Sequence, residues 1–306
     1  MKISVVTPSF NQGDYLERTI LSVVSQNYPD IEYLIMDGGS TDQSVDIIKK
    51  HQRNIDHWVS EKDGGQTDAV NKGFALATGE ILGWLNSDDI YYPQTLTTVA
   101  NYFGSHPECD VIYGMADYID AHDKVISEYP TRRWNYRELK SWCFICQPSV
   151  FIRKTVFEKH GPLDATLNFC MDYEYWLRCG EEKSFVYLRE KLAASRLYSE
   201  NKTIGSRPAV LEEIVRMLFD KYHHVHRRWL AERALETTGL ERGFEPKGIA
   251  RISWSAEALK KFYQDSNELN REFLPLIPMH MVMNLPVVPR RLLHSMRQTF
   301  ERKERN

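Results

Sequence analysis

Short apolar runs alternate with segments of helical periodicity over the first third of the chain. The runs at residues 3–6, 31–36 and 80–85 have the length and composition of buried strands, and residues 55–60 are expected to form a short strand. Between them, residues 14–26, 44–51 and 67–77 repeat apolar side chains every three to four positions, as Leu16, Ile20 and Val23 do. Strands that alternate with helices predict an α/β fold with a mostly parallel, doubly wound sheet flanked by helices.

The pattern loosens after Pro93 and changes again near residue 205. We expect helices at 96–103, 156–159 and 171–179, strands at 111–113 and 185–188, a hairpin at 116–128 and an extended segment at 142–152. Residues 208–235 and 255–274 are charged and helical in period. The sequence therefore predicts an α/β domain over residues 1–205 and a helical C-terminal extension over residues 206–306.

Composition mainly excludes classes of protein. The formal net charge of −3 gives no indication of nucleic-acid binding. The five cysteines lack framework spacing, and Cys143 and Cys146 have no second pair with which to bind zinc. The apolar run at residues 3–6 is too short for a signal peptide, and no window reaches the ~18–20 apolar residues of a membrane-spanning helix. We therefore expect a cytoplasmic protein with reduced thiols.

The end of the chain has two interpretations. Residues 273–293 are apolar but contain four prolines, and basic residues follow as far as Arg305. Such a segment can lie on an anionic membrane surface, which would give a peripheral contact through residues 273–306 at the inner face of the membrane. It can equally pack as a strap on the first domain and end in a charged tail.

Polar residues directly follow three of the predicted strands. Thr7, Pro8 and Ser9 form a predicted turn after the first strand, Asp37 ends the second, and Asn86-Ser87-Asp88-Asp89 follows the strand at 80–85. Carboxyl ends of parallel strands lie at one edge of a sheet, so these residues are expected to converge on one crevice. Carboxylates there suit Mg²⁺ or Mn²⁺, which can in turn hold phosphate oxygens. The edge is predicted to bind a phosphorylated ligand.

Nearby motifs have structural explanations beside functional ones. Asp42 stands where an N-cap for the helix at 44–51 is expected. Asp63-Gly64-Gly65 precedes the helix at 67–77, whose N-terminus can attract a phosphate or be capped by Thr67 or Asp68. The sequence has neither a Walker loop nor the glycine fingerprint of dinucleotide-binding folds, which disfavours a dehydrogenase.

The order of these motifs resembles that of the family 2 glycosyltransferases. The motifs at residues 7–11, 37–42, 71–73, 77–80 and 85–89 stand in that family's order, and the resemblance covers about residues 1–200. It implies a GT-A fold with a nucleotide-sugar half at about residues 1–95 and an acceptor half at about residues 96–205. It also implies that the donor substrate is a nucleotide-diphosphate sugar.

The resemblance implies roles for single residues as well. Asp88 is expected to hold a divalent cation, Mn²⁺ or Mg²⁺, and Asp89 to orient hydroxyls of the sugar. Asn86 occupies the first position of the family's DxD motif, where an acid is usual, and is expected to contribute to binding of the donor. The residues expected to bind the nucleotide are Thr7, Pro8, Ser9, Asp37, Asp63 and Asn71.

Inverting transfer needs a carboxylate that removes a proton from the acceptor hydroxyl. Asp172, just before Trp176-Leu177-Arg178, matches the base of the family, with Glu174 as the alternative. The structural explanation of Asp172 is that it caps the following helix. Gln147-Pro148-Ser149 matches an acceptor-side element, and Tyr198 stands in a loop where a histidine is usual.

We therefore expect an enzyme that transfers a single sugar to a glycan or a lipid-linked glycan, in bacterial-type surface polysaccharide or glycoconjugate synthesis. A nucleotidyltransferase would share the nucleotide-binding domain, but it requires basic residues after the first strand, and residues 7–15 contain none. A non-catalytic nucleotide-sugar-binding protein is the second alternative.

Overall fold

The computed structural model describes residues 1–199 and 201–237, together with Lys261 and Asp265. The chain divides into two units, Met1–Gly205 and Ser206–Asn306. The second unit begins with α9 (Arg207–Tyr222) and α10 (Arg227–Thr237), which contact each other. In the described part of the chain, no helix has the length and apolar character needed to cross a membrane. The segment 273–306 lies outside the described residues, as does almost all of the helix expected at 255–274.

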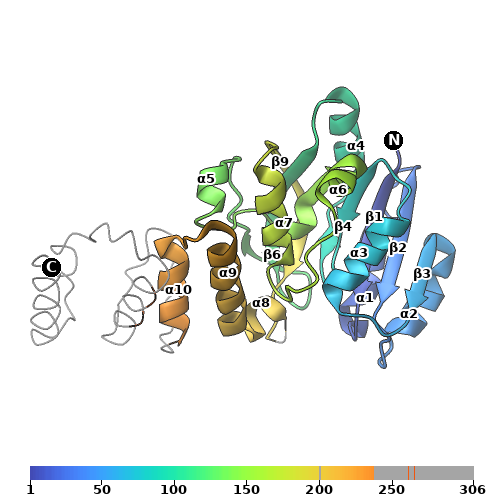
Figure 1. The fold of residues 1–306 in the computed structure, drawn as a ribbon. Helices are drawn as coiled ribbons and strands as arrows, with labels where there is room; N and C mark the ends of the chain where they lie inside the picture. The colour runs from blue at the N-terminus through green and yellow to red at the C-terminus, as the bar shows by residue number, and fades with distance from the viewer. Residues whose placement is uncertain (200, 238–260, 262–264, 266–306) are drawn as a thin grey trace, which may run out of the picture. The chain divides into compact units, whose positions relative to one another are not determined.

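Parallel strands form the first part of the sheet in unit Met1–Gly205 (Figure 1). β1 (Ile3–Ser9) lies between β2 (Ile31–Asp37) and β4 (Ile81–Trp84), and β3 (His57–Ser60) pairs with the other side of β2. Because these strands run in the same direction, their carboxyl ends lie at one edge. The residues predicted to converge there follow or end these strands.

The sheet becomes mixed beyond β4. β8 (Val150–Arg153) runs antiparallel between β4 and β6 (Val111–Ile119), and β9 (Val186–Arg196) runs parallel to β6. The outer strands β5 (Ile90–Tyr91) and β7 (Val125–Glu128) are antiparallel to β9 and β6. The predicted α/β fold with a mostly parallel sheet is therefore confirmed, with β5, β7 and β8 as its reversed strands.

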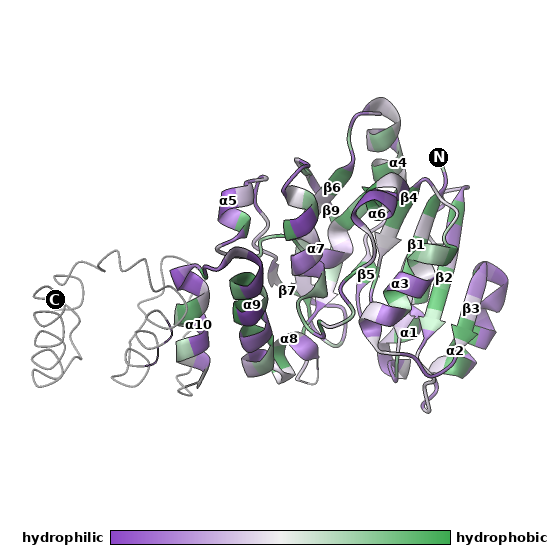
Figure 2. Cartoon of the chain, viewed as in Figure 1, coloured by the Kyte–Doolittle hydropathy of each residue, from purple (hydrophilic) through white to green (hydrophobic). Residues whose placement is uncertain are grey.

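Helices cover both faces of the sheet. Leu16 of α1 (Gly13–Val24), Ile48 of α2 (Ser44–His51) and Phe103 of α4 (Thr95–Ser105) belong to one buried cluster with residues of β1 and β2. Figure 2 shows these two strands as mainly hydrophobic. On the other face lie α3 (Gln66–Leu76) and α7 (Met171–Gly180), with α6 (Lys154–His160) beside α7. The short helices are η1 (Gln52–Asn54), α5 (Tyr136–Leu139), η2 (Gln147–Ser149) and α8 (Lys202–Gly205).

The predicted turn at Thr7, Pro8 and Ser9 is wrong, because these residues continue β1. β4 ends at Trp84, opposite Val6, whereas β2 pairs with β1 as far as Ser9. The backbone of Val6 faces β4 and that of Ser9 faces β2, so alternation turns Pro8 toward the side that β4 has left. A proline lacks a backbone donor, and here no neighbouring strand requires one.

A buried carboxylate joins the opposite ends of these strands. Glu32 accepts hydrogen bonds from the hydroxyl of Ser4, from the Thr78 amide at 2.7 Å and from the Thr78 hydroxyl at 2.6 Å. Lys2 forms an ion pair with the same carboxylate at 3.2 Å. Burial alone raises the pKa of Glu32, but the bonds from Ser4, Thr78 and Lys2 outweigh burial and lower it to about 2.

We expect Glu32→Gln to lower the free energy of unfolding at pH 7 by about 1–3 kcal/mol, because buried donors lose their charged acceptor. The folded-state pKa lies below the ordinary 4.5, so this stability is present above pH 4.5 and is lost as the pH falls toward 2. Urea denaturation between pH 7 and pH 3 measures both effects. Equal pH slopes in wild type and Glu32→Gln would contradict the assignment.

Candidate active site

The loop after β4 carries the acidic motif, residues 86–89, and is hydrogen-bonded to α1. The hydroxyl of Thr19 donates to the backbone carbonyls of Ser87, at 2.9 Å, and of Asp89, at 2.7 Å. The loop closes on itself through the Asp89 amide, which donates to the Asn86 carbonyl at 3.1 Å. The motif therefore stands at the carboxyl edge of the parallel strands in a fixed conformation.

Asp88 presents its carboxylate at this edge. The hydroxyl of Tyr198 donates to Asp88 Oδ2 at 2.9 Å, and Gln12 donates to the Tyr198 oxygen at 3.1 Å. Burial raises the pKa of Asp88, although the Tyr198 hydrogen bond and the nearby charges of Arg196 and Lys202 oppose that shift. A half-buried carboxylate whose pKa is raised is stabilised by any cation that reaches it.

The donor set around Asp88 fits a cation shared with a substrate. The described residues contain no cluster of three or more His, Cys, Asp or Glu side chains that could enclose a metal ion. The side-chain oxygen of Asn86 already accepts bonds from Gln66 and Trp84, both at 2.7 Å. Mg²⁺ is commonly held by one or two carboxylates, with water and substrate phosphates as the other ligands. Asp88 suits that arrangement.

Asp89 is turned into the protein. It is 3% exposed, its Oδ1 accepts the backbone amide of Arg196 at 2.9 Å, and its Oδ2 accepts the Asn86 amide at 3.2 Å. Burial and the adjacent Asp88 raise the pKa of Asp89 to about 8. This placement differs from the predicted contact with sugar hydroxyls, because both carboxylate oxygens already face donors of the protein.

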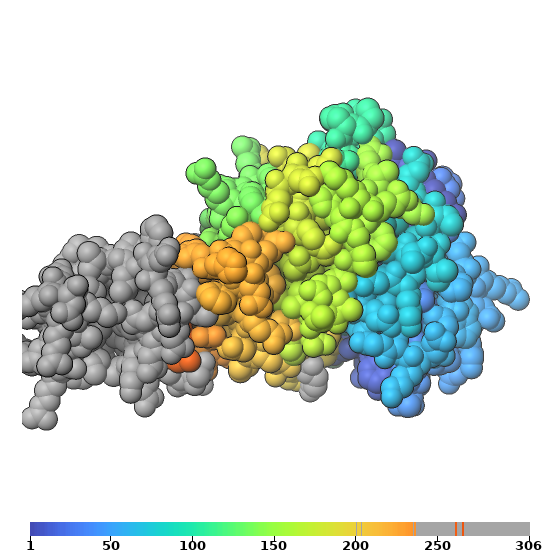
Figure 3. Space-filling view, viewed as in Figure 1, coloured from blue at the N-terminus to red at the C-terminus, as the bar shows by residue number. Residues whose placement is uncertain are grey.

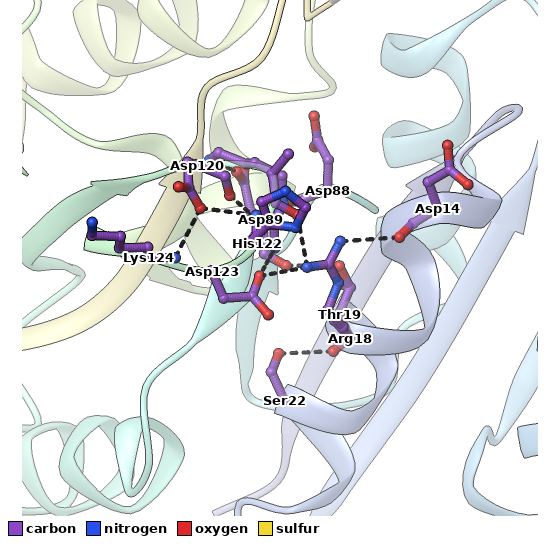
Figure 4. Close-up of polar contacts among 12 residues, drawn as sticks. Asp14, Arg18, Thr19, Ser22, Asp88, Asp89, Asp120, His122, Asp123 and Lys124 are labelled. Atoms are coloured by element: carbon purple, nitrogen blue, oxygen red, sulfur yellow. Dashed lines mark hydrogen bonds and ion pairs between the residues drawn. The ribbon is translucent and has the colours of Figure 1, made fainter. Parts of the chain in front are cut away.

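A buried arginine holds the backbone of the acidic loop. Arg196, 1% exposed, donates to the carbonyls of Asp88 and Asp120, both at 2.7 Å, and pairs with Asp123 at 2.5 Å. Arg18 of α1 pairs with the same Asp123 at 3.1 Å (Figure 4). The turn between β6 and β7 is thereby tied to the site. The partners of Arg196 lie too far along the chain for a local sequence pattern to reveal them.

The residues predicted to bind the nucleotide differ in whether their polar side-chain atoms already have hydrogen-bond partners in the protein. Thr7 is fully buried, with its hydroxyl 3.2 Å from that of Tyr33. Asp37 is 1% exposed and accepts bonds from the Ser40 amide at 2.9 Å and the Ser60 hydroxyl at 2.7 Å. The hydroxyl of Ser9, by contrast, is buried and has no hydrogen-bond partner among the described residues. Such an atom at a strand end indicates a ligand or a water.

Asp63 and Asn71 lie on either side of the start of α3. Asp63 accepts the Gly65 amide at 2.8 Å. Its carboxylate also lies close to the backbone of Gly38, because a Cβ added to that glycine would be 3.1 Å from it. Asn71 is paired with the backbone of Leu163, accepting its amide at 2.8 Å and donating to its carbonyl at 2.9 Å. Asn71 therefore joins α3 to the segment between α6 and α7, and in Figure 3 the yellow-green part of the chain lies against the cyan part that contains α3.

The two candidate bases, Asp172 and Glu174, differ in their exposure and in the partners of their carboxylates. Glu174 is 8% exposed and pairs with Arg178 at 2.9 Å, which commits it to an ion pair within α7. Asp172 is half-buried in the first turn of α7, where its Oδ1 accepts the amide of Tyr173 at 2.8 Å. The N-cap residue of α7 is Cys170, so Asp172 does not occupy the predicted capping position.

The thiol of Cys146, the residue before η2, is buried. Burial raises the pKa of the Cys146 thiol, and the charges of Asp89 and Asp172 add to that effect. Asp172 also raises the pKa of the Cys143 thiol, after the larger effect of burial.

A cavity of about 370 Å³ is lined by Asn11, Gln12, Asp14, Tyr15 and Tyr198, and the Tyr198 hydroxyl connects it to Asp88. Its volume lies within the ~300–1,000 Å³ that is usual for small-molecule sites. The rings of Tyr15 and Tyr198 pack with their centroids 4.7 Å apart, which fixes the side chain that bonds Asp88.

Comparisons with known proteins agree with this arrangement. The model of glycosyl transferase family 2 matches residues 4–161. An uncharacterized glycosyltransferase of Nostoc sp. is 31% identical over 234 residues, which are 70% of each chain. A PGL/p-HBAD biosynthesis glycosyltransferase of Mycobacterium bovis is 30% identical over 191 residues, 60% of this chain and 71% of that protein.

Solved structures of low sequence identity share the fold. Residues 1–349 of S. aureus TarS, in complex with UDP-GlcNAc, match with a TM-score of 0.59 and 16% identity over 88% of this chain and 80% of that one. In the longer TarS structure the match covers 87% of this chain and 49% of that one, with 19% identity and a TM-score of 0.56. The mannosyltransferase PcManGT of Pyrobaculum calidifontis, in complex with GDP-Man and Mn²⁺, matches with a TM-score of 0.59 and 14% identity over 89% and 76%. The expected GT-A fold is confirmed, and the chain belongs to glycosyltransferase family 2.

Proposed function

We propose that this glycosyltransferase transfers one sugar, with inversion, from a nucleotide-diphosphate sugar to a hydroxyl of a glycan or lipid-linked glycan. The observation that carries the proposal is the carboxylate of Asp88 at the carboxyl edge of the parallel strands, bonded to Tyr198, which lines a cavity. Asp172, half-buried in the first turn of α7, is the second acid of the proposal, because the alternative Glu174 is paired with Arg178. The complexes of TarS with UDP-GlcNAc and of PcManGT with GDP-Man and Mn²⁺ support a nucleotide-sugar donor and a divalent cation.

In the proposed reaction the acceptor oxygen bonds to the anomeric carbon while the bond from that carbon to the diphosphate breaks. Asp172 takes the proton that the acceptor hydroxyl loses. A divalent cation at Asp88 would neutralise charge on the leaving diphosphate. Lys202, which opposes the rise in the pKa of Asp88, would add positive charge beside the phosphates. The unpaired hydroxyl of Ser9 would bond the nucleotide.

Synthesis of a surface polysaccharide or glycoconjugate is the setting that we propose for this transfer. The proposal is supported by the mycobacterial relative, which is named for PGL/p-HBAD biosynthesis. A non-catalytic binding protein would retain the donor site without turnover, so measured turnover separates the two functions.

Asp172→Asn should reduce kcat for sugar transfer by about 10²–10⁴-fold, because the acceptor hydroxyl loses its base. The KM of the donor should change little, since Asp172 does not contact the diphosphate in the proposed reaction. Release of nucleoside diphosphate with donor and acceptor present measures both. Asp46→Asn on α2, whose side chain is 86% exposed, is the matched control. Unchanged kcat in Asp172→Asn would reject Asp172 as the base.

Nucleoside diphosphates should raise the melting temperature more in the presence of Mn²⁺ than in its absence. A ligand at 100 times its Kd stabilises the native state by about 2.7 kcal/mol. Asp88→Asn should remove the part of the shift that requires Mn²⁺, because the carboxylate that holds the cation is gone. A shift of equal size in Asp88→Asn would show that the cation binds elsewhere. A screen of uridine and guanosine diphosphates by thermal shift makes the comparison.

A further inference from the structure

The side-chain amide of Asn86 uses every hydrogen-bonding position that it has. Its oxygen accepts the Gln66 amide and the Trp84 indole N–H, both at 2.7 Å. Its nitrogen donates to Asp89 Oδ2 at 3.2 Å and to Gln147 Oε1 at 3.1 Å. An indole nitrogen can only donate, so the atom that faces Trp84 must be the oxygen. The orientation of the amide is therefore fixed by its partners.

These partners come from different parts of the fold. Gln66 begins α3, Trp84 ends β4, and Gln147 begins η2 in the acceptor half. Gln147 also bonds Trp84 directly, because its side-chain amide donates to the Trp84 carbonyl at 2.7 Å. On the other side, the Gln66 oxygen accepts Lys202 Nζ of α8 at 2.9 Å. A chain of side-chain amides thus runs from α8 through the acidic loop to η2.

We propose that Asn86 is a positioning residue, not a cation ligand, and that its site requires asparagine rather than aspartate. An aspartate could still accept from Gln66 and Trp84 with one oxygen. Its second oxygen would then face Asp89 Oδ2 and Gln147 Oε1, which are both acceptors. Two buried acceptors would lose their donor, and a third carboxylate would stand beside Asp88 and Asp89. The inference rests on the proposed function, because Asp88 is what Asn86 positions.

The two possible roles of position 86 predict opposite results. If Asn86 is a weak cation ligand, Asn86→Asp restores a second acid at DxD spacing, and Mn²⁺ should bind more tightly and activate at lower concentration. If Asn86 positions the loop, the same change displaces Asp88, so Mn²⁺ should bind more weakly and activate only at higher concentration. Because the hydrogen bonds of the Asn86 side-chain amide need its donor, we expect Asn86→Asp to be less active than wild type.

The experiment compares wild type with Asn86→Asp and Asn86→Ala. Asn101→Asp, an exposed residue of α4, is the control for the same chemical change. We expect Asn86→Asp to lower kcat/KM for the donor by about 10–100-fold, which corresponds to about 1.4–2.8 kcal/mol, and to raise the Mn²⁺ concentration of half-maximal activation. Asn101→Asp should match wild type. Equal or higher activity of Asn86→Asp at lower Mn²⁺ would overturn the proposal.

Two readouts keep the proposal separate from the question of sugar transfer. Electron paramagnetic resonance of free Mn²⁺ measures binding of the metal alone, and tighter binding by Asn86→Asp would reject the positioning role even in a protein that transfers no sugar. Nuclear magnetic resonance measures exchange of the Trp84 indole proton with solvent. It should be slow in wild type and Asn101→Asp, and faster in Asn86→Ala. Rapid exchange in wild type would also reject the proposal. If no nucleotide sugar is turned over by wild type, the proposed function fails while these readouts still decide the role of Asn86.

A second variant guards against misfolding of Asn86→Asp. Gln147→Met removes the partner of Asn86 in the acceptor half and adds no charge near Asp88. We expect it to lower kcat/KM and to raise the Mn²⁺ requirement in the same direction as Asn86→Asp, at a melting temperature that still indicates a folded protein. A Mn²⁺ requirement unchanged in Gln147→Met would contradict the proposed chain of amides.

Discussion

Two adjacent carboxylates at the edge of a sheet set the main constraint on this structure. Burial raises the pKa of both Asp88 and Asp89, and Asp88 raises that of Asp89 further. Such a pair is costly unless donors or cations compensate it. Asp89 is compensated from inside, by the amides of Arg196 and Asn86. Asp88 accepts the hydroxyl of Tyr198, with the charges of Arg196 and Lys202 nearby, and in the proposed reaction it is the carboxylate on which a cation would act.

The donors that satisfy this pair are supplied by distant parts of the chain. Thr19 lies on α1, Gln147 on η2, Arg196 at the end of β9, and Tyr198 just beyond it. Each contacts the loop after β4 or the residues it holds. The loop is therefore shaped by residues from the whole length of the GT-A domain. Residues 1–95 alone would lack the amide of Gln147 and the guanidinium of Arg196.

The sequence was informative where the signal is local. Hydrophobic runs predicted β1, β2 and β4, and parallel pairing then required Ser9, Asp37 and Asp88 to approach one edge. The extent of β1 was not predictable, because Pro8 is accommodated by the early end of β4, which is a property of the partner strand. The hydrogen-bond and ion-pair partners of individual side chains could not be predicted from the sequence either.

The contacts that the sequence could least reveal join residues that are far apart along the chain. Asn71 bonds Leu163, 92 residues away, and Arg196 bonds the carbonyl of Asp88, 108 residues away. No periodicity or spacing encodes such pairs, since they depend on how α3, α7 and β9 pack. Asp172 and Glu174 could be separated only by the ion pair that engages Glu174.

The turn between β6 and β7 illustrates what this dependence means for the evolution of the chain. A hairpin tip at the surface ordinarily tolerates insertions and drift. Here Asp123, a non-glycine residue with φ of 67°, receives Arg18 and Arg196, and the carbonyl of Asp120 receives Arg196 as well. A length change in this turn would release the arginine that fixes the backbone of Asp88. Selection on catalysis therefore reaches a surface loop that contacts no substrate in the proposed reaction.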